Sequence, residues 1–215
     1  MTQEKLLQVL NEVGAVITND HLVYTSGRHG SAYVNKDAIY PHVGLVETLC
    51  GQIVRHFSKD GIGVEYDVVA GPEKGGIILS QWTAYDSAHR WVQGKEILAV
   101  YAEKEGDVFV FRRGYEKLIP SQKVLIVEDV LTTGGSVSKV VDAVRKLGGE
   151  VVGVGALCNR GSVTAADIGG VPELYSILNI SLESWPEYEC PLCKQNVPIN
   201  TSVGKGYEFL MRRPV

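Results

Sequence analysis

The chain has 215 residues, of which 45% are hydrophobic, and its formal net charge at pH 7 is −4. This size and apolar content fit one domain with a substantial core, and the negative charge gives no general attraction to nucleic acid or to an anionic membrane. No apolar stretch approaches the ~20 residues needed to cross a bilayer, and no signal-peptide core follows the first residues. We therefore expect a cytoplasmic protein without a nucleic-acid or membrane partner.

Short strands and amphipathic helices alternate along most of the chain. This alternation is typical of an α/β fold with a central, mainly parallel sheet flanked by helices. In chain order we expect a helix at 6–13, a hairpin or turn region at 15–36, a helix at 41–57, a strand at 67–70, a helix at 77–89, strands at 97–101, 108–111 and 124–127, a helix at 137–147 and a strand at 151–157.

Residues 186–215 differ in character from the rest, because they combine four prolines, a cysteine pair and a Gly-Lys-Gly sequence. We interpret them as a small C-terminal extension of unknown role, packed on the domain or used in an oligomer contact. Residues 1–185 would then form the main domain, including N-terminal elements of a hood over the site.

The most informative segment begins with the apolar run 124–127, which is followed by Glu128 and Asp129. Ligands of open α/β sheets bind beyond the carboxyl ends of the strands, where this acid pair is expected. Adjacent carboxylates repel each other, so they are better tolerated facing hydroxyl donors or a metal. A glycine and hydroxyl loop leads into the next helix, whose N-terminus suits a phosphate. The loop residues are Thr132, Thr133, Gly134, Gly135 and Ser136.

A second loop, 71–76, has the same layout of buried strand, small residues and helix. Lys74, followed by Gly75, would lie at the carboxyl end of the strand, where an ammonium group among glycines can meet an anion. Alone, this segment could equally be an ordinary helix start with an exposed lysine. Together, the two loops offer separate cradles for two phosphate groups.

The sequence from Val124 to Ser136 closely resembles the phosphoribosyl-pyrophosphate (PRPP) motif of type I phosphoribosyltransferases. Residues 71–76 resemble the pyrophosphate loop of that family, in the form typical of its orotate branch. The resemblance implies transfer of ribose 5-phosphate from PRPP to a pyrimidine base, orotate, with release of pyrophosphate. It also implies a Mg²⁺ ion bound through PRPP and not directly by protein side chains.

The resemblance assigns roles to residues of both loops. Glu128 and Asp129 would hold the ribose hydroxyls and stabilise positive charge on the ring, and the loop 132–136 would bind the 5′-phosphate. Lys74 and Gly75 would bind the leaving pyrophosphate. The charged hairpin spanning about 101–118 would be a mobile hood that brings Lys104 to the site, often that of a neighbouring subunit, so we expect a homodimer.

Three further residues are expected to recognise the base. Ser26 and Tyr33 match positions of the orotate branch, although Thr25 replaces its usual lysine. Arg160 follows the strand 151–157, where the family contacts the orotate carboxylate, and an arginine can bind a carboxylate through two parallel hydrogen bonds. If they have no role in ligand binding, Ser26 and Tyr33 belong to an ordinary hairpin and Arg160 to a surface ion pair.

The hairpin departs from the orotate pattern, because it lacks the histidine and keeps only Lys104 of the basic residues; Arg112 or Arg113 could compensate. Two alternatives therefore stay open. One is a phosphoribosyltransferase for another base, and the other is a non-catalytic regulator that senses PRPP or a nucleotide.

The four cysteines are too few for a disulfide framework. Cys50 and Cys158 fall in apolar runs and are expected to be core thiols. Cys190 and Cys193 form a Cys-x-x-Cys pair, which is half of a zinc-site pattern with no second pair nearby in the sequence. Another chain could complete such a site, and a redox pair is the alternative.

Overall fold

The computed structural model describes residues 3–24, 26–59, 63–91, 96–180 and 183–212. The chain folds into two compact units. The smaller unit combines residues 1–41 with residues 181–215, and the larger unit comprises residues 42–180. The boundaries of these compact units differ from the predicted division into a main domain at 1–185 and a C-terminal extension at 186–215, which stays a prediction.

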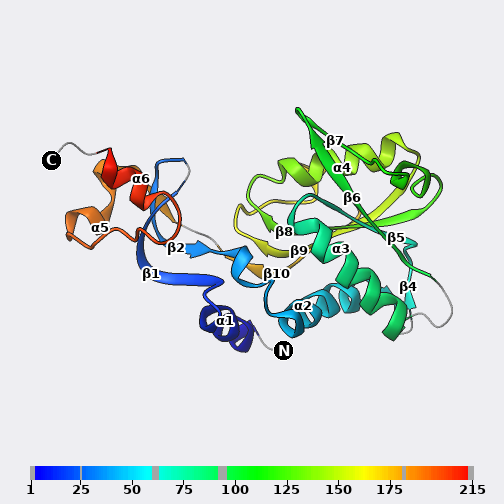
Figure 1. Ribbon diagram of the computed structural model, residues 1–215, viewed down its shortest axis with the longest axis horizontal. Helices are drawn as coiled ribbons and strands as arrows, with labels where there is room; N and C mark the ends of the chain where they lie inside the picture. The colour runs from blue at the N-terminus through cyan, green and yellow to red at the C-terminus, as the bar shows by residue number, and fades with distance from the viewer. Residues whose placement is uncertain (1–2, 25, 60–62, 92–95, 181–182, 213–215) are drawn as a thin grey trace. The chain divides into compact units, whose positions relative to one another are not determined.

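The larger unit is built on a six-stranded sheet (Figure 1). All neighbouring strands are parallel except the last pair, β6 and β7, which form an antiparallel hairpin. The strand order is β10 (Leu174–Asn179), β9 (Glu150–Asn159), β8 (Lys123–Leu131), β5 (Val68–Pro72), β6 (Leu98–Glu105) and β7 (Val108–Val110).

Helices cover both faces of this sheet (Figure 1). Helices α2 (Val43–His56) and α3 (Gly75–Asp86) lie on one face, and α4 (Gly135–Lys146) lies on the other. A π-helical segment, Ser87–Trp91, continues α3. The remaining short elements of this unit are strands β3 (Ser58–Lys59) and β4 (Gly63–Val64) and the 3-10 turns η3 (Tyr115–Lys117) and η4 (Ala166–Ile168).

The core under α4 follows from the sequence periodicity. The valines of α4 recur every three or four residues and therefore share one helix face. This face packs on every second residue of the strands, including Val124 and Ile126 of β8. The buried α4 positions are Val137, Val140, Val141 and Val144.

The smaller unit contains a three-stranded antiparallel sheet in the order β1 (Val16–Val23), β2 (His29–Val34) and β11 (Ser184–Trp185). The two ends of the chain thus contribute to the same sheet. Its helical elements are α1 (Gln3–Glu12), α5 (Pro191–Lys194) and α6 (Gly206–Met211), with 3-10 turns η1 (Lys36–Ala38) and η5 (Glu187–Glu189). Among the described residues, no helix has both the length and the apolar character that a membrane crossing requires.

The expected α/β fold with a mainly parallel sheet is confirmed, as are the hairpin after β6 and the buried positions of Cys50 and Cys158. One expectation was wrong: the strand predicted at 124–127 continues to Leu131, so the acid pair lies within β8 and not beyond it. The reason is that β9 continues to pair with β8 as far as Leu131 and Asn159. Strands β3, β4, β10 and β11 were not predicted.

Candidate functional site

The two predicted ligand loops lie at the same edge of the sheet. Strands β5 and β8 are parallel neighbours, with Val68 opposite Val124 and Ala70 opposite Ile126. Each strand leads through a short loop into a helix, α3 and α4 respectively. Because the carboxyl ends of parallel neighbours face the same way, the sheet brings both loops to the edge where α/β proteins bind ligands.

The loop after β8 forms a small polar pocket. Gly134, in the left-handed region at φ 74°, precedes the first residue of α4. A pocket of about 110 Å³ is lined by Glu128, the end of β8 and the loop as far as Val137. The helix N-terminus and the hydroxyls of Thr132, Thr133 and Ser136 give this pocket donors for an anion.

The acid pair is almost completely buried at the end of β8. Glu128 is 7% exposed and Asp129 is 6% exposed. The Glu128 carboxylate accepts a hydrogen bond from the Asp129 backbone N–H at 2.9 Å, and the Asp129 carboxylate accepts one from the Val130 N–H at 2.7 Å. Successive strand residues point to opposite faces, so Glu128 shares the face of α4 and lines the pocket, whereas Asp129 lies on the other face.

The loop after β5 depends on two glycines that touch. A Cβ added to Gly71 would come within 2.7 Å of the Gly76 backbone, so only glycine lets the strand end and the helix start approach this closely. Lys74 precedes α3 and is exposed, as its predicted role requires. The peptide bond between Glu73 and Lys74 is cis.

This loop is also tied to the hairpin. The backbone N–H of Glu73 donates to the Ala102 carbonyl at 2.9 Å, and the Glu73 carboxylate accepts a hydrogen bond from the Lys104 N–H at 3.0 Å. Lys74 and Lys104 therefore lie on segments that contact each other. The role of Glu73 as an acceptor could not be predicted from the sequence, because it depends on a contact between segments that are distant in the chain.

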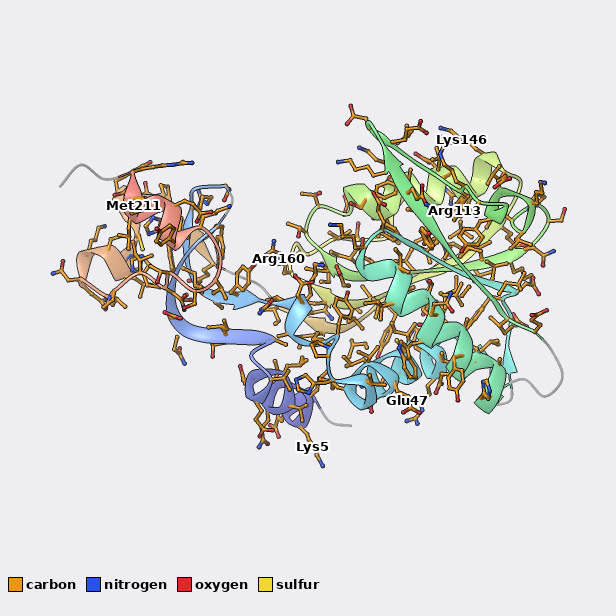
Figure 2. The ribbon with its side chains drawn as sticks, in the orientation of Figure 1. Lys5, Glu47, Arg113, Lys146, Arg160 and Met211 are labelled. Atoms are coloured by element: carbon orange, nitrogen blue, oxygen red, sulfur yellow. The ribbon has the colours of Figure 1, made fainter. Side chains whose placement is uncertain are left out.

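The arginines of the hairpin are paired within the hairpin itself. Arg112 contacts Glu105 at 2.5 Å, and Arg113 contacts Glu103 at 2.7 Å (Arg113 is labelled in Figure 2). The hydrogen bond to Glu103 raises the pKa of the Arg113 guanidinium. These pairs weaken the case that either arginine substitutes for the missing basic residues, and they leave Lys104 as the better candidate.

Arg160, labelled in Figure 2, lies just beyond β9 and contacts the loop after β8. Its Nε donates a hydrogen bond to Thr132 Oγ1 at 3.1 Å, and its backbone N–H donates to the Leu131 carbonyl at 3.0 Å. A Cβ on Gly161 would overlap the Thr132 carbonyl oxygen, at 1.6 Å. Gly161 thus permits the close contact that holds Arg160 beside the pocket, and no sequence signal identified it.

The predicted base-recognition residues near the N-terminus belong to the smaller unit. Tyr33 lies on β2 opposite Ile17, and Ser26 is in the exposed turn before β2, where its Oγ accepts a long hydrogen bond from the Arg28 N–H at 3.5 Å. Thr25 lies outside the described residues. The structure therefore gathers Glu128, Asp129, the two loops, Lys104 and Arg160 in one unit and places Ser26 and Tyr33 in the other.

Comparison with known proteins gives consistent matches over most of the chain. The phosphoribosyl transferase domain family matches residues 37–187. The orotate phosphoribosyltransferase of Pelotomaculum thermopropionicum is 38% identical over 198 residues, which are 92% of this chain and 95% of that protein. The orotate phosphoribosyltransferase of Caldanaerobacter subterraneus is also 38% identical, over 93% of this chain and 96% of that protein.

Solved structures show the same fold. Orotate phosphoribosyltransferase from Mycobacterium tuberculosis, in complex with Fe(III) dicitrate, superposes with a TM-score of 0.62 at 26% identity, covering 81% of this chain and 94% of that one. The same enzyme in complex with PRPP gives a TM-score of 0.59 at 24% identity, covering 82% and 94%.

Proposed function

This chain belongs to the phosphoribosyltransferase family, and we propose that it is an orotate phosphoribosyltransferase, which forms orotidine 5′-phosphate and pyrophosphate from orotate and PRPP. The observation that carries this proposal is the 38% identity to orotate phosphoribosyltransferases over more than nine-tenths of both chains. In the reaction, the bond between C1 of the ribose and the pyrophosphate oxygen breaks and its electron pair leaves with pyrophosphate. A bond from a ring nitrogen of orotate to C1 forms, and that nitrogen gives up its proton to pyrophosphate or water.

The loop after β8 and the acid pair bind the ribose 5-phosphate part of PRPP. The loop hydroxyls and the N-terminus of α4 bind the 5′-phosphate, which matches the polar pocket there. Glu128 and Asp129 hold the ribose hydroxyls. Because positive charge develops on the ribose as the C1–O bond breaks, two fixed carboxylates stabilise the transition state more than the ground state.

Lys74, Gly75 and Lys104 bind the pyrophosphate group of PRPP. The contact between Glu73 and the Lys104 backbone supports a joint role for the two lysines in stabilising the leaving group. Mg²⁺ would bind mainly through PRPP oxygens and water, which are the hard oxygen ligands that this ion prefers, and not directly through protein side chains. When bound, Mg²⁺ neutralises charge on the pyrophosphate.

The hairpin closes over PRPP and excludes water, which would otherwise hydrolyse it. If the hairpin serves a neighbouring subunit, the active form is a homodimer. A cytoplasmic location fits this role, since both substrates, PRPP and orotate, are small polar metabolites.

On the acceptor side, Arg160 binds the carboxylate of orotate; Ser26 and Tyr33, which belong to the smaller unit, are the further residues that the family resemblance assigns to the base. Replacing Arg160 with alanine is expected to raise KM for orotate about 10- to 100-fold, because hydrogen bonds to charged groups contribute about 1.5–3 kcal/mol. KM for PRPP should change much less. Steady-state kinetics with each substrate varied in turn measure both values, and the exposed Arg55→Ala on α2 is the control. A rise confined to KM for PRPP would mean that Arg160 serves the phosphate instead.

The function itself is tested by incubating the purified chain with PRPP, Mg²⁺ and a panel of bases: orotate, uracil, adenine, guanine and hypoxanthine. We expect pyrophosphate release with orotate alone, matched by an equal amount of orotidine 5′-phosphate on chromatography. Release only with another base would favour a phosphoribosyltransferase that acts on that base, the alternative suggested by the altered hairpin. PRPP binding without release for any base would identify a sensor.

A further inference from the structure

Four side chains that commonly bind metals converge in the smaller unit. His21 lies on β1 and His29 on β2, while Cys190 precedes α5 and Cys193 lies within it. One ligand atom from each residue lies within 4.8 Å of all the others. The two histidines come from the N-terminal segment and the two cysteines from the C-terminal segment of the same unit. The second pair of ligands is therefore in this chain, and no other chain is needed to complete the set.

The sulfur–nitrogen distances between these atoms are those of a tetrahedral zinc site. Cys190 Sγ and Cys193 Sγ each lie 3.6 Å from His21 Nε2, and Cys193 Sγ lies 3.4 Å from His29 Nδ1. Around a tetrahedral zinc ion, a sulfur and a nitrogen ligand are about 3.5 Å apart and two nitrogens about 3.3 Å apart. The two ring nitrogens here are 2.8 Å apart, so the rings would separate slightly around an ion.

The surroundings fix the ligands in a binding orientation. His21 is 1% exposed, and His29 and Cys190 are fully buried. His21 Nδ1 lies 2.7 Å from the Val197 carbonyl oxygen. A histidine that donates Nδ1–H to a carbonyl presents the lone pair of Nε2, which is the usual second-sphere support of a metal ligand. The ring of Phe209 from α6 packs edge-on against His29 at 4.9 Å between ring centroids and shields that side.

We propose that His21, His29, Cys190 and Cys193 bind one structural zinc ion that joins the β1–β2 hairpin to the C-terminal segment. Two thiolates and two imidazoles in tetrahedral reach favour zinc among the common metals. Four protein ligands complete the coordination, so the site has a structural and not a catalytic character. A redox role for the Cys-x-x-Cys pair fits less well, because a reactive thiol needs access and Cys190 has none. The proposal does not depend on the proposed enzymatic activity.

The test is the metal content of the full chain, produced without a histidine tag and dialysed before inductively coupled plasma mass spectrometry. We expect about one zinc ion per chain, as for a four-ligand structural site. Cys193→Ser and His21→Asn should each lose most of it. Cys158→Ser, a buried cysteine of the other unit, and His42→Asn, an exposed histidine, are matched controls that should keep it. A folded wild-type chain without zinc, or ligand variants that retain it, would overturn the proposal.

A spectroscopic measurement on the wild-type chain covers the case in which the ligand variants fail to fold. After exchange of zinc for Co²⁺, we expect a thiolate-to-cobalt charge-transfer band and the intense visible bands of tetrahedral coordination. Removal of the metal with a strong chelator should lower the melting temperature, and added Zn²⁺ should restore it. Weak octahedral cobalt bands, or a melting temperature indifferent to chelator and zinc, would show that no such site exists.

Discussion

Glu128→Gln is expected to lower kcat/KM by about 100- to 1000-fold, the usual cost of removing one preorganised electrostatic contact from a transition state. Glutamine has the size of glutamate, and its amide oxygen can still accept the hydrogen bond from the Asp129 N–H. The chain should stay folded and be at least as stable as the wild type, since the change removes repulsion between two buried neighbouring carboxylates. Initial rates with orotate and PRPP, combined with thermal melts, measure both effects.

Asp129→Asn provides the comparison within the pair. A similar loss for this variant would support a role for both carboxylates at the ribose. A loss for Glu128→Gln alone would assign the ribose contact to the carboxylate in the pocket and would refute the role given to Asp129. Asp142→Asn, an exposed carboxylate on α4, is the control for general charge effects and should retain full activity.

Gly134→Ala is expected to destabilise the chain by about 2–5 kcal/mol, combining about 1–2 for a left-handed backbone with about 1–3 for overpacking. The added Cβ would lie 2.6 Å from Ile168 Cγ2 and 3.0 Å from Val163 Cγ1, and Ile168 is fully buried and cannot yield easily. Relief of the clash must shift the phosphate loop, so KM for PRPP should rise about tenfold or more, equivalent to at least about 1.4 kcal/mol. Urea unfolding and PRPP kinetics measure the two effects.

Gly148, at the other end of α4, separates backbone strain from the clash. It also has a left-handed conformation, at φ 80°, but a Cβ there would meet nothing within 4 Å. Gly148→Ala should therefore cost only about 1–2 kcal/mol of stability and leave KM for PRPP unchanged. An equal rise in KM for both variants would mean that Gly134 is not required by the geometry of the phosphate loop.

Most of the larger unit could be predicted from the sequence, because its signals are local. The valine periodicity of α4 and the apolar runs of β5, β8 and β9 report burial directly. The extension of β8 through Glu128 and Asp129 could not be predicted in this way, since charged residues end an apolar run while pairing with β9 continues. Strand β11 has two residues, too few for any periodicity.

The candidate site likewise contains residues that could be predicted from local sequence and residues that could not. Each ligand loop is one continuous stretch of sequence, so the residues within it, including the glycines, the hydroxyls and Lys74, could be recognised together. The contact of Arg160 with Thr132 joins residues 28 positions apart, and that of Glu73 with Lys104 joins residues 31 apart. The histidines that face Cys190 and Cys193 are more than 160 positions away from them. Such pairs become visible only when the topology brings the segments together.

The division of the chain into a continuous and a discontinuous unit has a consequence for biosynthesis. Domains generally fold in the order in which they leave the ribosome. Here residues 42–180 are complete while the C-terminal half of the smaller unit is still untranslated. The N-terminal segment therefore cannot complete its sheet until β11, the partner of β2, has emerged from the ribosome. The segment 1–41 is thus among the later parts to reach its final structure, although it precedes residues 42–180 in the chain, and loading of a metal at His21 and His29 would be a late step of maturation.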